Sequence, residues 1–122
     1  MASLKPFRFG PIALTNALTT NLLNPGAASG GVNAGTPNLF ILLRHIRVVN
    51  KTAGAVTFSL WLGGTGGNVA GTEVIGQAKS VAANSYEDWY GALRLDVADF
   101  LVGGASANPS LSIEGEGEIG VA

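Results

Sequence analysis

The chain has 122 residues, enough for one domain with its own core, and 47% of them are apolar. Charged residues make up only 12%, about half of the usual share of roughly 25%, which favours a surface that is partly buried against partners. The formal net charge of −1 argues against nucleic-acid binding, and the absence of cysteine excludes disulfides, zinc fingers and thiol nucleophiles.

Neither export nor membrane insertion is predicted. The first residues, MASLKPFRFG, lack the apolar segment of a signal peptide. The longest uninterrupted apolar run, LFILL at 39–43, is far shorter than the roughly 18 residues that a membrane span needs. We therefore expect a soluble protein that is made without export and has no membrane partner.

Residues 1–38 are predicted to form an extended N-terminal arm and loop. Proline-containing turns punctuate this segment, and AASGGVNAG at 27–35 has the composition of a flexible loop. The stretch PIALTNALTTNLLN at 11–24 fits helical and strand periodicity equally well, but its threonine and asparagine content disfavours a helix. We expect extended segments that lie on another surface.

Residues 39–122 are predicted to form an all-β domain, an antiparallel β-sandwich or jelly roll. LFILLRHIRVVN at 39–50 and AVTFSLWL at 55–62 are rich in β-branched and aliphatic residues, with a turn over 50–54 between them. Alternation along the first strand puts Leu42, Arg44, Ile46 and Val48 on one face and Leu43, His45, Arg47 and Val49 on the other.

The remaining segments continue this pattern of short strands and turns. GGTGGN at 63–68 reads as a loop, TEVIGQAKSV at 72–81 as a short strand, SYEDWYGALRLD at 85–96 as a strand, DFLVGGASANP at 99–109 as a connection and SLSIEGEGEIGV at 110–121 as the closing strand. Six to eight strands with turns about every 8 to 14 residues are typical of a sandwich or jelly roll.

The charges are distributed unevenly along the chain. The first 51 residues contain five basic residues and no acid, whereas the remainder contains all eight acids with Lys79 and Arg94. This polarity suits head-to-tail contact between copies of the chain, and pairing of the acids and bases within one fold is the alternative.

No catalytic, cofactor-binding or metal-binding residue is predicted. His45 is the only histidine and lies within a strand, so a packed or half-exposed side chain is expected there. The glycine loop at 63–68 lacks the spacing of a phosphate-binding motif. Glu87 and Asp88 are adjacent in a strand and therefore point to opposite faces, where they cannot share one proton or one metal.

Aromatic and basic residues are the candidates for contacts with partners. Of Trp89 and Tyr90, one is expected in the core and the other at the surface. Trp61, on the polar side of its strand, is an interface candidate, with packing under the N-terminal arm of its own chain as the alternative. Lys5, Phe7, Arg8 and Phe9 are expected to dock on an acidic partner, with the two phenylalanines as anchors.

The closing strand contains three alternating glutamates, Glu114, Glu116 and Glu118. Alternate residues of a strand lie about 6.6 to 6.8 Å apart, too far for three carboxylates to enclose one cation without other ligands. We predict a strand whose acidic face contacts a basic segment such as 5–8, from the same chain or the next. The intervening Gly115 and Gly117 suggest a bulge, or another group pressed close to the backbone.

Two stretches, LRHIRVVNKTAGAVTFSLWLGG and VAANSYEDWYGALRLDVADFLVGGAS, resemble small β-sandwich virion proteins of tailed bacteriophages. The resemblance covers residues 39–119 and rests on structural motifs, so it carries no active-site residue across. It implies a capsid decoration (cement) protein, or a related head-tail accessory protein, built as a ring or trimer. An extended N-terminal arm is what such proteins commonly use to reach neighbours.

The first expectation is therefore a non-enzymatic virion structural protein without a cofactor. It would form a homo-oligomer, with a trimer favoured, and bind the major capsid protein or other virion subunits. One alternative is a tail, collar or head-tail connector component of the virion. A second is a carbohydrate-binding jelly roll with Trp61, Trp89 or Tyr90 as its aromatic platform.

Overall fold

The computed structural model describes residues 3–25, 38–107 and 111–121, and this part of the chain contains eight strands and no α-helix. The strands are β1 (Ser3–Leu14), β2 (Asn21–Leu23), β3 (Asn38–Asn50), β4 (Val56–Gly63), β5 (Lys79–Val81), β6 (Ser85–Asp96), β7 (Phe100–Ala105) and β8 (Leu111–Val121). The prediction of an all-β protein is confirmed. The loop predicted at 27–35 lies outside the described residues.

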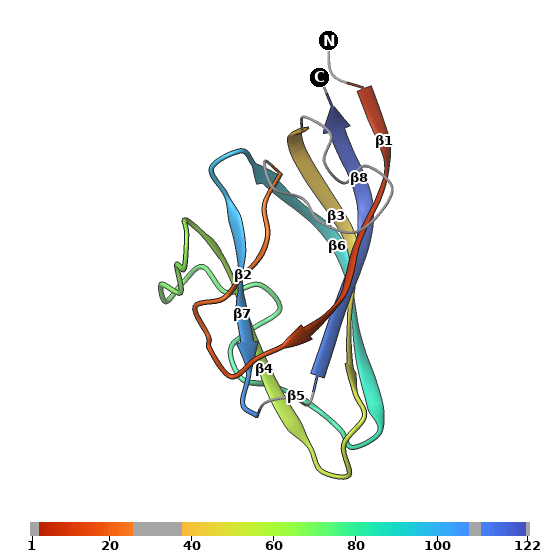
Figure 1. Cartoon of the computed structure of the whole chain (residues 1–122), viewed down its shortest axis with the longest axis vertical. Helices are drawn as coiled ribbons and strands as arrows, with labels where there is room; N and C mark the ends of the chain where they lie inside the picture. Colours follow the sequence, from red (N-terminus) through yellow and green to blue (C-terminus); the bar gives the residue numbers. More distant parts are fainter. Residues whose placement is uncertain (1–2, 26–37, 108–110, 122) are drawn as a thin grey trace.

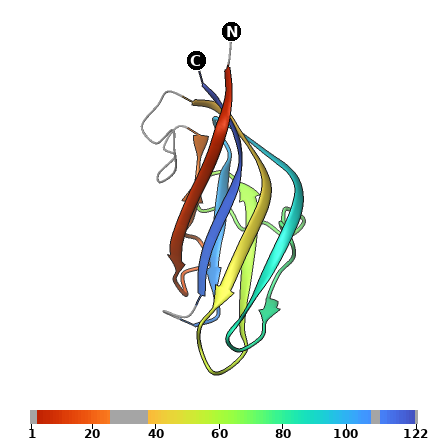
Figure 2. The ribbon, with the colours of Figure 1, turned by 90° about the vertical axis from the view of Figure 1, so that its right-hand side faces the viewer.

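The strands form two antiparallel sheets of four strands each, which lie face to face (Figure 1). The first sheet has the order β1-β8-β3-β6 and the second has the order β2-β7-β4-β5. Figure 2 looks onto the outer face of the first sheet, with β1 and β6 at its two edges. Every pair of neighbouring strands is antiparallel.

The N-terminal segment contributes one edge strand to each sheet. β1 pairs with β8 from Ser3, opposite Val121, to Leu14, opposite Leu111. β2 pairs with β7 in the second sheet. The extended conformation expected for this segment is therefore present, and the surface on which its strands lie is supplied by the C-terminal strands of the same chain.

The core fills the space between the two sheets. Its largest fully buried side chains come from six strands: Phe9 and Leu14 of β1, Ile41, Leu43, Ile46 and Val48 of β3, Phe58 and Leu60 of β4, Leu95 of β6, Leu101 of β7, and Ile113 and Ile119 of β8. Full burial of one such side chain stabilises the folded state by about 1.5–3 kcal/mol. This apolar layer fixes which face of each strand points outward.

A bulge in β3 changes the alternation that the sequence predicts. Ile41 and Leu43 are buried, but beyond Arg44 the buried residues are Ile46 and Val48, which have the opposite parity. The physical reason is an extra residue: Leu43 lies opposite Gly117 and His45 opposite the adjacent Glu116, so Arg44 has no counterpart on β8. The predicted grouping of Leu42 with Ile46 is therefore wrong.

Two segments differ from their predicted states. Residues 100–105 form the strand β7, which pairs with β2 and β4, rather than a connection. Its Gly103 and Gly104 lie where other backbone passes close. A Cβ at Gly103 would meet the Ser59 carbonyl oxygen, and one at Gly104 would approach the Thr15 carbonyl oxygen. Conversely, only Lys79–Val81 of the predicted strand at 72–81 pairs with β4, and Glu73 forms a single bridge to Trp61.

The predicted turn at 50–54 is confirmed and is organised by one buried side chain. Asn50 is fully buried, and its Nδ2 donates hydrogen bonds to the carbonyl oxygens of Gly54 and Val81. Its Oδ1 accepts hydrogen bonds from both the backbone nitrogen and the hydroxyl of Thr52. The amide thus joins β3, the turn and β5.

Candidate functional site

The charged residues of the first sheet are arranged in strands of alternating sign. β1 carries Lys5 and Arg8; β8 carries Glu114, Glu116 and Glu118; β3 carries Arg44, Arg47 and His45; β6 carries Glu87, Asp88, Arg94 and Asp96. With His45 counted as neutral, the net charges are +2, −3, +2 and −2 in the order β1-β8-β3-β6. Because opposite charges on neighbouring strands attract, this arrangement stabilises the sheet, by about 0.2–1 kcal/mol for each well-placed pair. We call its outer surface the charged face.

A hydrogen-bonded cluster of three side chains joins β3 to β6 on the charged face. Asp88 accepts two bonds from Arg47, from Nε at 2.7 Å and from a terminal nitrogen at 3.2 Å. The Nε2 atom of His45 lies 2.7 Å from the same carboxylate, and its Nδ1 atom lies 3.3 Å from Glu116 on β8. The imidazole therefore bridges carboxylates from two different strands.

The Arg47–Asp88 pair shifts the titration of both groups. Hydrogen bonds from Arg47 lower the pKa of the Asp88 carboxyl below its ordinary value, with a smaller contribution in the same direction from His45. The same hydrogen bond raises the pKa of the Arg47 guanidinium. Asp88 is thus held as the carboxylate, which keeps the arginine in a fixed orientation.

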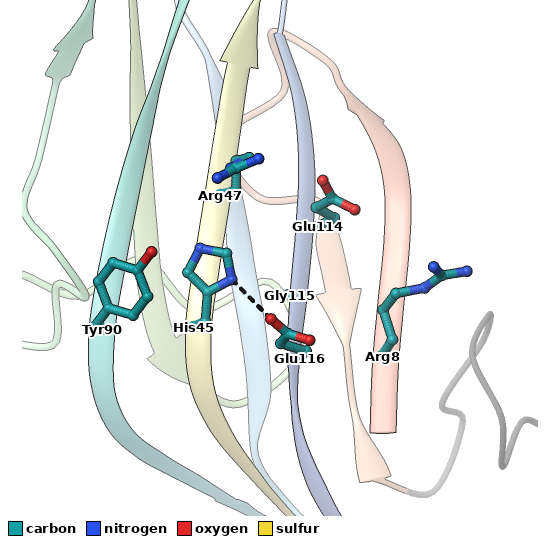
Figure 3. Close-up of a pocket in the computed structure, with 7 residues that line it drawn as sticks. All are labelled: Arg8, His45, Arg47, Tyr90, Glu114, Gly115 and Glu116. Atoms are coloured by element: carbon teal, nitrogen blue, oxygen red, sulfur yellow. Dashed lines mark ion pairs between the residues drawn. The ribbon is translucent and has the colours of Figure 1, made fainter. Parts of the chain in front are cut away.

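A hollow of about 390 Å³ lies beside this cluster (Figure 3). It is lined by Arg8 from β1, His45 and Arg47 from β3, Tyr90 from β6, and residues 114–116 from β8. The Tyr90 ring stacks on the imidazole of His45, with ring centroids 4.7 Å apart, and remains 71% exposed. The hollow therefore offers an aromatic surface next to guanidinium and carboxylate groups.

The three glutamates predicted on one face of the closing strand do lie together there. Glu118 accepts a hydrogen bond of 2.6 Å from Arg44, Glu116 lies beside His45, and Glu114 lines the hollow. The predicted basic neighbour is the same chain's own β1, in which Arg8 lies opposite Glu116. Arg8 and Lys5 are exposed.

Three of the predicted contact residues are buried within the chain. Phe7 and Phe9 face the other sheet as members of the core, because they lie on the same side of β1 and alternate with the exposed Arg8. Trp61 is only 3% exposed, although it lies on the side of β4 that faces away from the main core. These rings stabilise the fold and are not available as exposed anchors.

The expectations for the adjacent pairs in β6 are confirmed. Asp88 points to the charged face, while Glu87 lines a second hollow of about 250 Å³ whose other walls include the core residues Val48 and Phe58. Trp89 packs against the core and Tyr90 is exposed.

The sequence did not identify the His45–Asp88–Arg47 cluster. Asp88 lies about 40 residues after His45 and Arg47 in the chain. The three side chains meet only because β3 pairs with β6 in one register, with Arg47 opposite Asp88. The one available signal is the alternation within each strand, and the bulge at Arg44 interrupts that signal on β3.

The hollow brings together guanidinium, imidazole, phenol and carboxylate groups. Across residues 3–25, 38–107 and 111–121, no three His, Cys, Asp or Glu side chains are grouped so that they could hold a metal ion. The same residues contain no helix long and apolar enough to cross a membrane.

No protein-family model matches the chain, and no curated protein sequence is similar to it.

Proposed function

We propose that the two sheets form an eight-stranded jelly roll. In support, the chain passes between the sheets at most of its connections, so that β1, β3, β6 and β8 belong to one sheet and β2, β4, β5 and β7 to the other. The resulting orders, β1-β8-β3-β6 and β2-β7-β4-β5, are those of a double Greek key. Viral capsid domains and lectins are built on this arrangement.

We further propose that the protein is a non-enzymatic virion structural protein of a tailed bacteriophage, a capsid decoration protein that binds the shell as an oligomer. The observation that supports this best is the uneven distribution of charge between the two sides of the molecule. Eleven of the fifteen charged residues lie in strands of the first sheet. β2, β4 and β7 contain none, and β5 contains only Lys79.

The uncharged side is the one suited to burial against a shell. The segment at 15–20 contains no charged residue and passes close to β7, and the loop at 64–78 contains only Glu73. Leu18 and Val69 are exposed on these segments. Burying apolar surface contributes about 25 cal/mol per Å² before association costs, and several weak contacts from one oligomer raise the avidity. The charged face is then left for water or for neighbouring copies.

Binding to shells tests this proposal directly. The purified chain should sediment with expanded shells assembled from the major capsid protein of the phage that encodes it, and should raise the temperature at which those shells disassemble. Val69→Asp should weaken the binding at least tenfold, because it places a charge on the uncharged side. Val97→Asp is the matched control, since Val97 is similarly exposed but follows the charged strand β6. Absence of saturable binding by the unaltered chain would overturn the proposal.

A lectin-like function is a second candidate, favoured by the exposed Tyr90 ring at the rim of the hollow. A sugar could stack on the ring and form hydrogen bonds with Glu114, Glu116 and Arg8, which surround the same space. A glycan array should then give hits that Tyr90→Ala removes and Tyr86→Ala retains. An array without hits would eliminate this candidate.

A further inference from the structure

The two edges of the first sheet are opposite in charge and alike in length. β1 and β6 each have 12 residues, and among the strands of the described residues each has a neighbour on one side only. β1 carries a net charge of +2 and β6 a net charge of −2. An edge strand whose backbone groups face outward is a template for pairing with another strand.

The directions of the two edges also match. Because all neighbours in the order β1-β8-β3-β6 are antiparallel, β1 and β6 run in opposite directions. A second copy placed beside the first in the same orientation would bring its β1 antiparallel to β6. The sheet would continue without interruption, and the alternation of positive and negative strands would continue with it.

Exposed apolar surface is concentrated on the same two strands. Leu4 of β1 and Tyr86 and Tyr90 of β6 are three of the six large hydrophobic residues that are exposed in the described part of the chain. Trp89 at the β6 edge is only partly buried. Pairing of the edges would cover this surface, whereas an isolated molecule leaves it in water.

Charge also decides between the ways in which two copies can pair. Contact of two β6 edges would bring together two strands of net −2, and contact of two β1 edges would bring together two strands of net +2. Like charges directly opposite one another in a sheet are destabilising. Only the pairing of β6 with β1 brings opposite charges together.

We propose that copies of this chain assemble head to tail, with β6 of one copy pairing antiparallel with β1 of the next. The pairing specifies the interface of the oligomer that the proposed function expects. It rests on that function in this respect alone. A register with Arg8 of one copy opposite Asp88 of the next brings Leu4 opposite Ala92 and Phe7 opposite Trp89. In this register the exposed Arg8 approaches the Asp88 carboxylate, which Arg47 of its own chain already contacts, and the exposed Leu4 lies against the exposed Ala92. A repeated contact of this kind closes into a ring when its rotation permits, and a trimer is such a ring.

Cysteine crosslinking tests the interface cleanly, because the chain contains no cysteine of its own. The double variant Leu4→Cys/Ala92→Cys should form disulfide-linked oligomers under mild oxidation, while Leu4→Cys and Ala92→Cys alone should each yield no more than background dimer. Both positions are exposed, so the variants should fold. Efficient dimer formation by Ala92→Cys alone would show that two β6 edges pair and would overturn the proposal. A double variant that stays monomeric would also overturn it.

Charge reversal provides the second readout. Arg8→Glu should lower the average mass in sedimentation velocity and shift the assembly midpoint to at least tenfold higher concentration. Lys51→Glu, in the turn after β3, is the matched control and should leave the assembly unchanged. Equal assembly of the two variants would contradict the proposed edge.

Shell binding separates this inference from the proposed function. If the unaltered chain binds shells but the double cysteine variant does not crosslink, the edge pairing is wrong and the decoration function stands. If the double variant crosslinks but shells are not bound, the edge pairing stands and the decoration function is wrong.

Discussion

Asn50 is the polar residue on which the turn between β3 and β4 depends. Its fully buried amide makes four hydrogen bonds, two as donor and two as acceptor. Asn50→Ala should lower the free energy of unfolding by about 2–4 kcal/mol, because the buried Val81 carbonyl and the partly buried groups of the turn would lose a partner, and a buried unsatisfied group costs about 1–3 kcal/mol. Urea denaturation measures this loss. Asn50→Asp should cost at least as much, because a buried carboxylate oxygen would face the carbonyl oxygens of Gly54 and Val81; a variant as stable as the unaltered chain would contradict the role assigned to the amide.

Asp88 makes the stability of the fold depend on pH in the acid range. Its pKa in the folded state is lowered from the ordinary value of 3.8, chiefly by the hydrogen bonds from Arg47. The stabilisation that the ionised Asp88 contributes to the folded state is therefore fully present above about pH 3.8, and it is lost as the pH falls through the lowered pKa of the folded state. Asp88→Asn should flatten the acid limb of the stability curve, measured by thermal unfolding between about pH 5 and pH 2.5.

The control for this prediction is Asp96→Asn. Asp96 also contacts an arginine, Arg94, but the carboxylate and the guanidinium are both more than half exposed. An acid limb that changes equally in the two variants would contradict the role assigned to Asp88.

At the scale of the strand, the two glycines in the middle of β8 allow close packing on both sides. A Cβ at Gly115 would collide with the ring of Phe9, and a Cβ at Gly117 would collide with the Leu42 carbonyl oxygen. Their presence between glutamates predicted such a close approach, and the structure confirms it. The bulge that accompanies it lies on β3, opposite Gly117.

Gly117→Ala should destabilise the protein more than Gly115→Ala, because a backbone carbonyl in a paired strand has less freedom to move than a phenylalanine ring. Overpacking of this kind typically costs about 1–3 kcal/mol. Gly54→Ala is the matched control, since no atom lies within 4 Å of the added methyl group. Chemical denaturation of the three variants gives the order, and a Gly117→Ala variant as stable as Gly54→Ala would contradict the packing argument.

Strands that alternate strictly could be predicted from the sequence, while strands shaped by neighbouring backbone could not. The sequence of β4 alternates strictly, and this strand lies where expected, as does β6. β7 contains two adjacent glycines, which resemble a loop in the sequence but are required in the structure because other backbone passes close to them. The bulge at Arg44 depends on pairing with β8, some 70 residues further along the chain, and no local pattern indicates it.

The same reasoning explains how much of the charged face could be predicted. The acidic face of β8 follows from alternation alone, whereas its pairing with Arg44 and His45 depends on register. Phe7 and Phe9 were expected to contact a partner because their segment was expected to lie apart from the domain. Once β1 becomes a strand of the first sheet, alternation with Arg8 directs both rings into the core.

For the whole molecule, the central feature is its separation into a charged side and an uncharged side. Eleven of fifteen charged residues lie on one sheet, and that sheet ends in edges of opposite sign. A protein so organised can contact its own copies through the edges of the charged sheet and a shell through the uncharged side. The two kinds of contact do not compete for the same surface.

Quantitative mass spectrometry of purified virions tests the central claim most directly. If the proposed function is correct, peptides of this chain are present in intact particles in a fixed ratio to the major capsid protein, with many copies per particle, and the ratio persists through gradient purification. Virions of the encoding phage that contain no peptides of this chain would contradict it.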